Sequence, residues 1–233
     1  MIPLYSDRQL SRIPFVTVLL IIINCVVFWY QLTSAGSIRQ SVWLYGVIPY
    51  ELFHAGEIDI AGRTPLAFSF VTSMFTHGGF IHLGSNMLYL WVFGRDVEDD
   101  FGHGTFLLFY IVAGILSSLV FVTAFPGTKI PLVGASGAIA GLLGSYFLRF
   151  PLTKIYTLFF FIIIVRIVPI PAFILLGLWF GIQFLACMAN ATAGAAGEGG
   201  IAFLSHITGF VTGLVWTILI LRRRFFERRH GYE

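Results

Sequence analysis

The chain has 233 residues, of which 58% are hydrophobic and only 11% are charged, and its mean hydropathy is +0.89. Soluble domains carry about 25% charged residues, so this composition excludes an ordinary soluble globule and predicts a multi-pass integral membrane protein. The formal net charge is +3. The two cysteines, Cys25 and Cys187, lie in apolar runs without metal-ligand spacing. We therefore expect neither a disulfide framework nor a cysteine metal site.

Six apolar segments approach the roughly 20 residues that a helix needs to cross a bilayer. In chain order they cover residues 13–32, 71–94, 105–125, 132–148, 168–189 and 201–221. The first is too long for the apolar core of a secretory signal and lacks a small-residue cleavage site, so we expect a spanning helix there. The sequence thus predicts an all-α polytopic membrane protein with a bundle of six transmembrane helices.

The segments between the predicted spans differ in character. Residues 33–70 are polar and aromatic, and we expect an extended first loop with short helices of its own. Residues 156–171 are apolar but contain Arg166 and two prolines, which favours a connector lying along the membrane surface. Residues 189–200 read ANATAGAAGEGG, which predicts a flexible loop. With a basic tail at 222–233, the whole of 1–233 is expected to form a single membrane domain.

The basic residues predict the orientation. If the N-terminus lies inside, all of the 14 Lys and Arg residues except Arg39, Arg63 and Lys129 fall in inner segments. Cytoplasmic segments of membrane proteins carry the excess of Lys and Arg. Both termini are therefore expected in the cytoplasm.

Four polar side chains within the spans are candidates for function, because such residues are costly in lipid. They are His82 and Asn86 in the second span, Ser136 in the fourth and His206 in the sixth. Counting residues from each span's inner arginine, at about 1.5 Å per residue, places His82, Ser136 and His206 about 20–24 Å above the cytoplasmic edge. Asn86 lies one turn from His82 on the same helix face. All four are thus expected in one plane, in the outer third of the membrane.

Glycine stripes accompany two of these residues. Gly134, Gly137 and Gly141 surround Ser136 in GASGAIAG, and Gly209 and Gly213 follow His206 in HITGFVTG. Small residues four apart allow helix backbones to approach closely. Packing of the fourth span on the sixth would bring Ser136 and His206 within hydrogen-bond reach.

A serine beside a histidine suggests nucleophilic catalysis, because histidine can remove the serine proton. The Asp and Glu residues all lie away from the outer parts of the spans, so we expect a Ser–His dyad without an acidic third member. The backbone N–H of Ser136 and the side chains of His82 and Asn86 are candidate donors to an oxyanion. No metal or cofactor is expected.

The combination of motifs resembles the rhomboid family of intramembrane serine proteases. GASG is similar to the nucleophile motif of that family, HITGFVTG to its histidine motif, and HGGFIHLGSN, with His77, His82 and Asn86, to its H-x-x-x-x-H-x-x-x-N segment. The order, spacing and helix assignment of the three motifs agree with the family pattern.

The resemblance implies that Ser136 is the nucleophile and His206 the general base. It also implies an oxyanion hole of His82, Asn86 and the backbone N–H groups of Ala135 and Ser136, in a water-filled cavity open to the outside. The fifth helix and residues 189–200 would form the gate. The implied partners are the lipid bilayer and single-pass membrane proteins cut near the outer face, with no nucleic acid. The expected location is the bacterial inner membrane.

Some residues depart from the family pattern. Phe68 and Ser69 stand where many relatives have Trp-Arg, so anchoring of the first loop would differ, with Arg63 as a candidate anchor. Ala140 replaces a tyrosine that stacks on the histidine in some relatives, so another group must hold His206. Ser205 replaces a more usual alanine.

Other classes of function stay open beside the protease. A catalytically silent rhomboid-like protein that binds and escorts membrane proteins would share most of these motifs. A transporter lined by the four polar residues is disfavoured, because no polar trail leads to the cytoplasmic side. A haem protein using His82 and His206 would leave the serine–glycine motif unexplained. A metalloprotease lacks the H-E-x-x-H motif.

Overall fold

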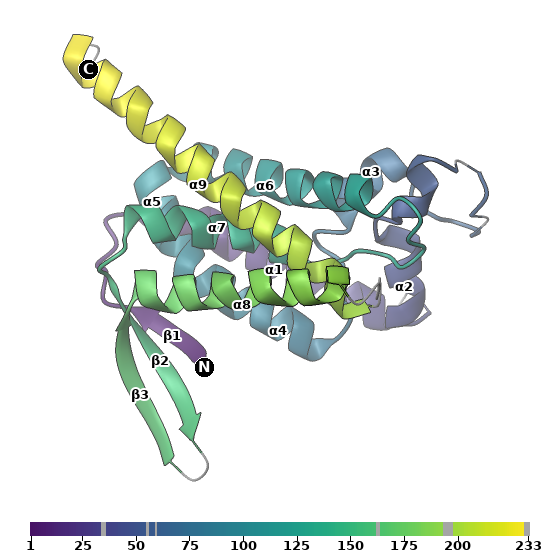
Figure 1. The fold of residues 1–233 in the computed structure, drawn as a ribbon, viewed down its shortest axis with the longest axis horizontal. Helices are drawn as coiled ribbons and strands as arrows, with labels where there is room; N and C mark the ends of the chain where they lie inside the picture. The colour runs from purple at the N-terminus through teal and green to yellow at the C-terminus, as the bar shows by residue number, and fades with distance from the viewer. Residues whose placement is uncertain (34–35, 55, 59, 162–163, 193–197, 231–233) are drawn as a thin grey trace.

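The computed structural model describes residues 1–33, 36–54, 56–58, 60–161, 164–192 and 198–230. Four helices in this part of the chain are long and apolar enough to cross a membrane: α1 (Phe15–Thr33), α6 (His103–Ala124), α8 (Ala172–Thr192) and α9 (Glu198–His230). Their candidate spans have mean hydropathies between 1.8 and 2.4 and overlap the first, third, fifth and sixth predicted spans. The protein is thus a mostly helical integral membrane protein (Figure 1).

The other two predicted spans are less regular. The fourth contains α7 (Ser136–Arg149), which has 14 residues and is too short to cross a bilayer alone. The second overlaps only the end of α3 (Leu66–Thr72), is not helical over residues 73–79, and becomes helical again in α4 (Phe80–Tyr89). A π-helical turn (Leu90–Gly94) then joins α4 to α5 (Arg95–Phe101). The count of six spans therefore stays a prediction.

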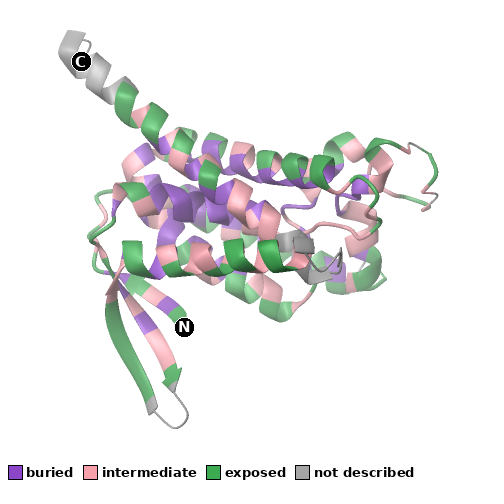
Figure 2. Ribbon diagram, in the orientation of Figure 1, coloured by how far each residue is buried: buried purple, intermediate pink, exposed green. Residues whose placement is uncertain are grey.

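The core forms around α7, which packs against both α6 and α9. Buried residues are concentrated along α7 in Figure 2. The glycines of α9 allow it to approach α7 closely: a Cβ on Gly209 would overlap the carbonyl oxygen of Gly137, and one on Gly213 would overlap that of Gly141. Larger residues at these positions would push the two backbones apart.

The acidic residues of α5 tie the ends of several elements together. Glu98 accepts hydrogen bonds from the backbone N–H groups of Val16 (2.8 Å) and Thr17 (2.7 Å), which caps the first turn of α1. Asp96 accepts from Ser6 Oγ (2.7 Å) and from Tyr146 Oη (2.8 Å) on α7. Burial raises the pKa of the Asp96 carboxyl, and these hydrogen bonds oppose the shift.

The prediction of an all-α fold is wrong in one region. Residues 156–171, expected as a surface connector, instead lie in a hairpin of β2 (Lys154–Phe161) and β3 (Ile164–Pro171). The N-terminal strand β1 (Ile2–Ser6) pairs with β2, which gives an antiparallel sheet in the order β1-β2-β3. The β-branched and aromatic residues of these segments favour strands, and the two prolines are tolerated because β3 is an edge strand.

The connecting segments differ from expectation in part. The first loop contains α2 (Ile38–Tyr45) and a 3-10 helix (Pro49–Leu52), as expected. The predicted loop at 189–200 is helical at both ends, because α8 continues to Thr192 and α9 begins at Glu198, and residues 193–197 lie outside the described part. Most of the predicted tail at 222–233 is helical too, since α9 reaches His230.

Candidate functional site

The four polar residues singled out in the sequence line one cavity of about 270 Å³. They come from three elements: His82 and Asn86 from α4, Ser136 from the start of α7, and His206 from the first part of α9. The other lining residues are Ser85, Tyr89, Leu132, Val133, Ile139, Leu143 and Trp179. A small, mainly apolar cavity with a few convergent polar groups is typical of a ligand or active site.

Ser136 is the first residue of α7, directly after an irregular turn. Gly134 has a φ of +110°, and its N–H donates to the carbonyl of Ser73 (2.8 Å). A Cβ on Gly134 would lie 2.7 Å from His82 Nε2 and 3.4 Å from Asn86 Nδ2, so these side chains lie directly against the backbone that precedes the serine. The first N–H groups of a helix have no partner within the helix. Those at the start of α7 are thus suited to bind a negative charge.

His206 is held by α8. Its Nδ1 lies 2.8 Å from Oε1 of Gln183, and its ring centroid lies 5.8 Å from that of Trp179. An amide oxygen can only accept a hydrogen bond, so Nδ1 carries the hydrogen. The other ring nitrogen, Nε2, is then free of hydrogen and can accept a proton. These contacts supply the support for His206 that Ala140 cannot give.

No motif in the sequence marks Gln183 as part of the site. The available signal was a single amide in the apolar run AFILLGLWFGIQFLACM of the fifth span. A polar side chain in such a run usually faces a protein partner rather than lipid. The identity of that partner depends on how α8 packs on α9, which the sequence alone does not give.

His82 and its neighbour His77 are fixed in different ways. The N–H of Gly78 donates to His82 Nδ1 (3.4 Å), so His82 Nε2 carries the hydrogen and lies against Gly134. His77 is buried, and its backbone is bonded in both directions to the side chain of Gln31 (3.0 and 3.1 Å). His77 thus shapes the turn before α4, whereas His82 presents a donor at the cavity.

Asn86 is buried and also a candidate donor. Its side-chain nitrogen Nδ2 has no hydrogen-bond partner among the residues that the structure describes. Buried donors without a partner are rare because the lost hydrogen bond is costly. A bound group with an acceptor oxygen would satisfy this one.

Arg63 anchors the first loop. Its guanidinium group bonds to the carbonyl oxygens of Trp43 and Gly46 and to the carboxylate of Glu51. Phe68 is exposed, and the Ser69 hydroxyl bonds to the carbonyl of Leu66 (2.7 Å) within its own helix. The loop is therefore held by Arg63 rather than by residues 68 and 69.

Within the described residues, no group of three or more His, Cys, Asp and Glu side chains could hold a metal ion. The chemistry that these residues can perform is that of a serine and a neutral histidine. A hydroxyl, a ring nitrogen able to accept a proton and several N–H donors around one cavity suit acyl transfer.

Comparison with known proteins identifies the class. Residues 65–223 match the rhomboid domain, which is more than half of the chain. The chain therefore belongs to the rhomboid family, and the resemblance seen in the sequence is confirmed.

Several curated proteins are similar to the chain. Rhomboid protein 1, mitochondrial, from Saccharomyces cerevisiae is 35% identical over 154 residues, which is 64% of this chain and 40% of that protein. Rhomboid protease GluP from Bacillus subtilis is 33% identical over 133 residues, 57% of this chain and 24% of that protein. Rhomboid-like protein 11, chloroplastic, from Arabidopsis thaliana is 31% identical over 118 residues, 50% and 39% respectively. The chain spans less than half of the length of each.

Proposed function

We propose that the protein is an intramembrane serine endopeptidase that cuts single-pass membrane proteins near the outer face of the bilayer. The observation that carries the proposal is the shared cavity of Ser136 and His206, with Nδ1 of the histidine bonded to an amide oxygen. Membership of the rhomboid family supports it, since one similar member is named a protease.

The first step would be attack by Ser136 on the scissile carbonyl carbon. Nε2 of His206 takes the proton from Ser136 Oγ as the bond from Oγ to carbon forms. The tetrahedral intermediate then collapses, the carbon–nitrogen bond breaks, and His206 delivers the proton to the leaving amine. A water molecule, activated by His206 in turn, hydrolyses the acyl-enzyme and restores the serine.

The developing oxyanion needs fixed donors. His82 Nε2–H, Asn86 Nδ2–H and the N–H groups of Ala135 and Ser136 would provide them. Their placement around Gly134 supports this role, because the donors come from two elements and converge beside the nucleophile. Removal of one oxyanion donor from a serine protease costs about 10²–10³ in kcat.

The wider arrangement is also part of the proposal. Six spans with both termini in the cytoplasm would place the cavity in the outer part of the membrane, with α8 and the segment that follows it as the gate. A bacterial inner membrane would suit this orientation. The similar proteins named above include mitochondrial and chloroplastic ones, so location has to be measured in the source cell.

The test is cleavage of a single-pass substrate with a destabilised outer helix by the purified protein in detergent. Wild type should cleave, and Ser136→Ala and His206→Ala should be inactive while still folded. Ser145→Ala is the matched control, because it removes a serine from the same helix whose hydroxyl bonds to Thr217 Oγ1 (2.7 Å). Cleavage by Ser136→Ala at the wild-type rate would refute the proposal.

A silent rhomboid-like binding protein is the alternative, and a serine-reactive probe separates the two. An isocoumarin or fluorophosphonate should label wild type and spare Ser136→Ala. Labelling without cleavage would point to a narrow substrate range. Absence of both labelling and cleavage, in a folded protein, would favour the binding protein.

A further inference from the structure

We propose that Gln183 is the positioning residue for His206, the neutral counterpart of the acid in a Ser–His–Asp triad. This inference rests on the proposed function. It assigns to α8, which contributes neither the serine nor the histidine, a direct part in aligning the catalytic groups.

The contact itself is specific. Oε1 of Gln183 lies 2.8 Å from Nδ1 of His206, which is a good hydrogen-bond distance. Trp179 precedes Gln183 by four residues, so both lie on the same face of α8 and contact the same ring. The imidazole is therefore fixed by one directional hydrogen bond and one aromatic neighbour.

The consequence of this bond is a choice of tautomer. With the hydrogen on Nδ1, His206 presents an unprotonated Nε2 as the base. In proteases with a triad, an acceptor at Nδ1 has this role, and loss of the correct tautomer lowers kcat by about 10⁴. An amide serves the same purpose in the Cys-His-Asn proteases. A neutral acceptor also suits a membrane-spanning helix, where a carboxylate is costly.

The same contact links catalysis to the position of α8. Besides Trp179, Phe180 packs on α9, with its ring centroid 4.6 Å from that of Phe210. A displacement of α8 from α9 would remove the hydrogen bond and the aromatic contact together. His206 is thus correctly oriented only while α8 lies against α9.

A structural role is the competing explanation, since amides also hold membrane helices together. Gln183→Met separates the two, because it keeps the length of the side chain and removes the acceptor. We expect kcat to fall by about 100-fold or more with KM nearly unchanged, by comparison with tautomer loss in a triad. The rate of Ser136 labelling by a fluorophosphonate should fall in parallel. Leu185→Met, on the exposed side of the same helix, is the matched control and should retain wild-type kcat.

Gln183→Glu restores an acceptor and should recover kcat to within about tenfold of wild type. Its pH–rate profile should differ, with the acid limb displaced to higher pH, because a carboxylate stabilises the imidazolium form. A purely structural glutamine would not produce this displacement. If Gln183→Glu does not fold, ¹⁵N spectra of the imidazoles in wild type and Gln183→Met give the answer. The signal assigned through His206→Ala should lose its Nδ1–H character in Gln183→Met.

The outcomes are distinct from those for the proposed function. If wild type does not cleave or react with the probe, the serine-protease proposal fails. If wild type cleaves but Gln183→Met keeps the wild-type kcat, Gln183 is not a positioning residue and the protease assignment stands. The same conclusion follows if the ¹⁵N signal of His206 is unchanged in Gln183→Met.

Discussion

Gly134 lies two residues before Ser136, at a position where the backbone conformation and the surrounding side chains both require glycine. Its φ of +110° lies in a region that favours glycine, and its Cα faces the ring of His82 and the amide of Asn86 on α4. The turn before α7 needs both this positive φ and the absence of a Cβ beside α4. The same turn sets the direction of Ser136 Oγ and of the first N–H groups of α7.

Gly134→Ala should therefore disturb the site more than the fold. A Cβ there would lie 2.7 Å from His82 Nε2, so either the turn or the candidate donor has to move. We expect kcat to fall by about 10² or more, comparable to the loss of an oxyanion donor, in a protein that still unfolds cooperatively. Gly104→Ala, where a Cβ meets nothing within 4 Å, is the control. Equal peptidase activity in the two variants would contradict this view of the turn.

Site residues that belong to a sequence motif could be predicted from the sequence, whereas Gln183, which belongs to none, could not. Ser136 and His206 can be identified from the sequence because glycines at helical spacing accompany each of them, and spacing is a local property. Gln183 is one amide in an apolar run, and its importance depends on which face of α8 meets α9. That relation is set by tertiary packing, which a single sequence does not reveal.

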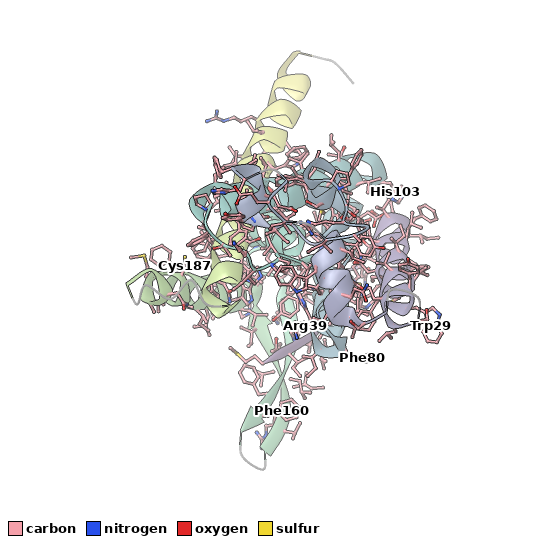
Figure 3. All side chains as sticks on the ribbon, turned by 90° about the vertical axis from the view of Figure 1, so that its right-hand side faces the viewer. Trp29, Arg39, Phe80, His103, Phe160 and Cys187 are labelled. Carbon is pink, nitrogen blue, oxygen red and sulfur yellow. The ribbon has the colours of Figure 1, made fainter. Side chains whose placement is uncertain are left out.

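At the scale of elements, the β-hairpin is the feature that local patterns predicted least well. Its residues are apolar with no helical breaks until the prolines, so length and hydropathy favoured a membrane-associated connector. The register of β2 depends on pairing with β1, which lies near the N-terminus and far from β2 in the sequence; Pro3, for example, pairs with Thr157. In Figure 3 the hairpin extends beyond the helical bundle, with Phe160 close to its tip.

The two faces of the hairpin differ in charge. One face carries Phe160, Val165 and Ile167, which are 61%, 58% and 51% exposed. Arg166 lies on the other face, paired with Phe159. Exposed apolar surface of this kind is costly in water, and an unpaired strand edge is costly in the hydrocarbon core. The bilayer interface is the environment that suits both the exposed apolar face and the unpaired strand edge.

We expect the apolar face of the hairpin to contact lipid. In a background with Cys25 and Cys187 replaced by serine, nitroxide labels on Ile167→Cys and Arg166→Cys report the environment in proteoliposomes. The label at 167 should be relaxed more by oxygen than by a water-soluble nickel complex, and the label at 166 should show the reverse. Equal access of the nickel complex to both labels would mean that the hairpin lies in water.

At the scale of the whole molecule, charge divides the structure into two ends. Arg8, Arg95, Arg149 and Lys154 all lie at the end where α7 stops and the sheet begins, and the carboxylates of α5 pair with several of them. The guanidinium group of Arg95 lies over the ring of Trp91, 5.6 Å from its centroid, and tryptophan is enriched at membrane interfaces. The cavity adjoins the opposite end of α7.

This polarity predicts that the charged end is cytoplasmic. Gly127 and Leu152 flank α7 at its two ends, and both are exposed, so cysteines there test the orientation without disturbing the core. With Cys25 and Cys187 replaced by serine, an impermeant maleimide on intact cells should label Gly127→Cys and should reach Leu152→Cys only after permeabilisation. The reverse pattern would place the cavity in the inner part of the membrane, and the substrates of the proposed protease would then have to be cut on the cytoplasmic side.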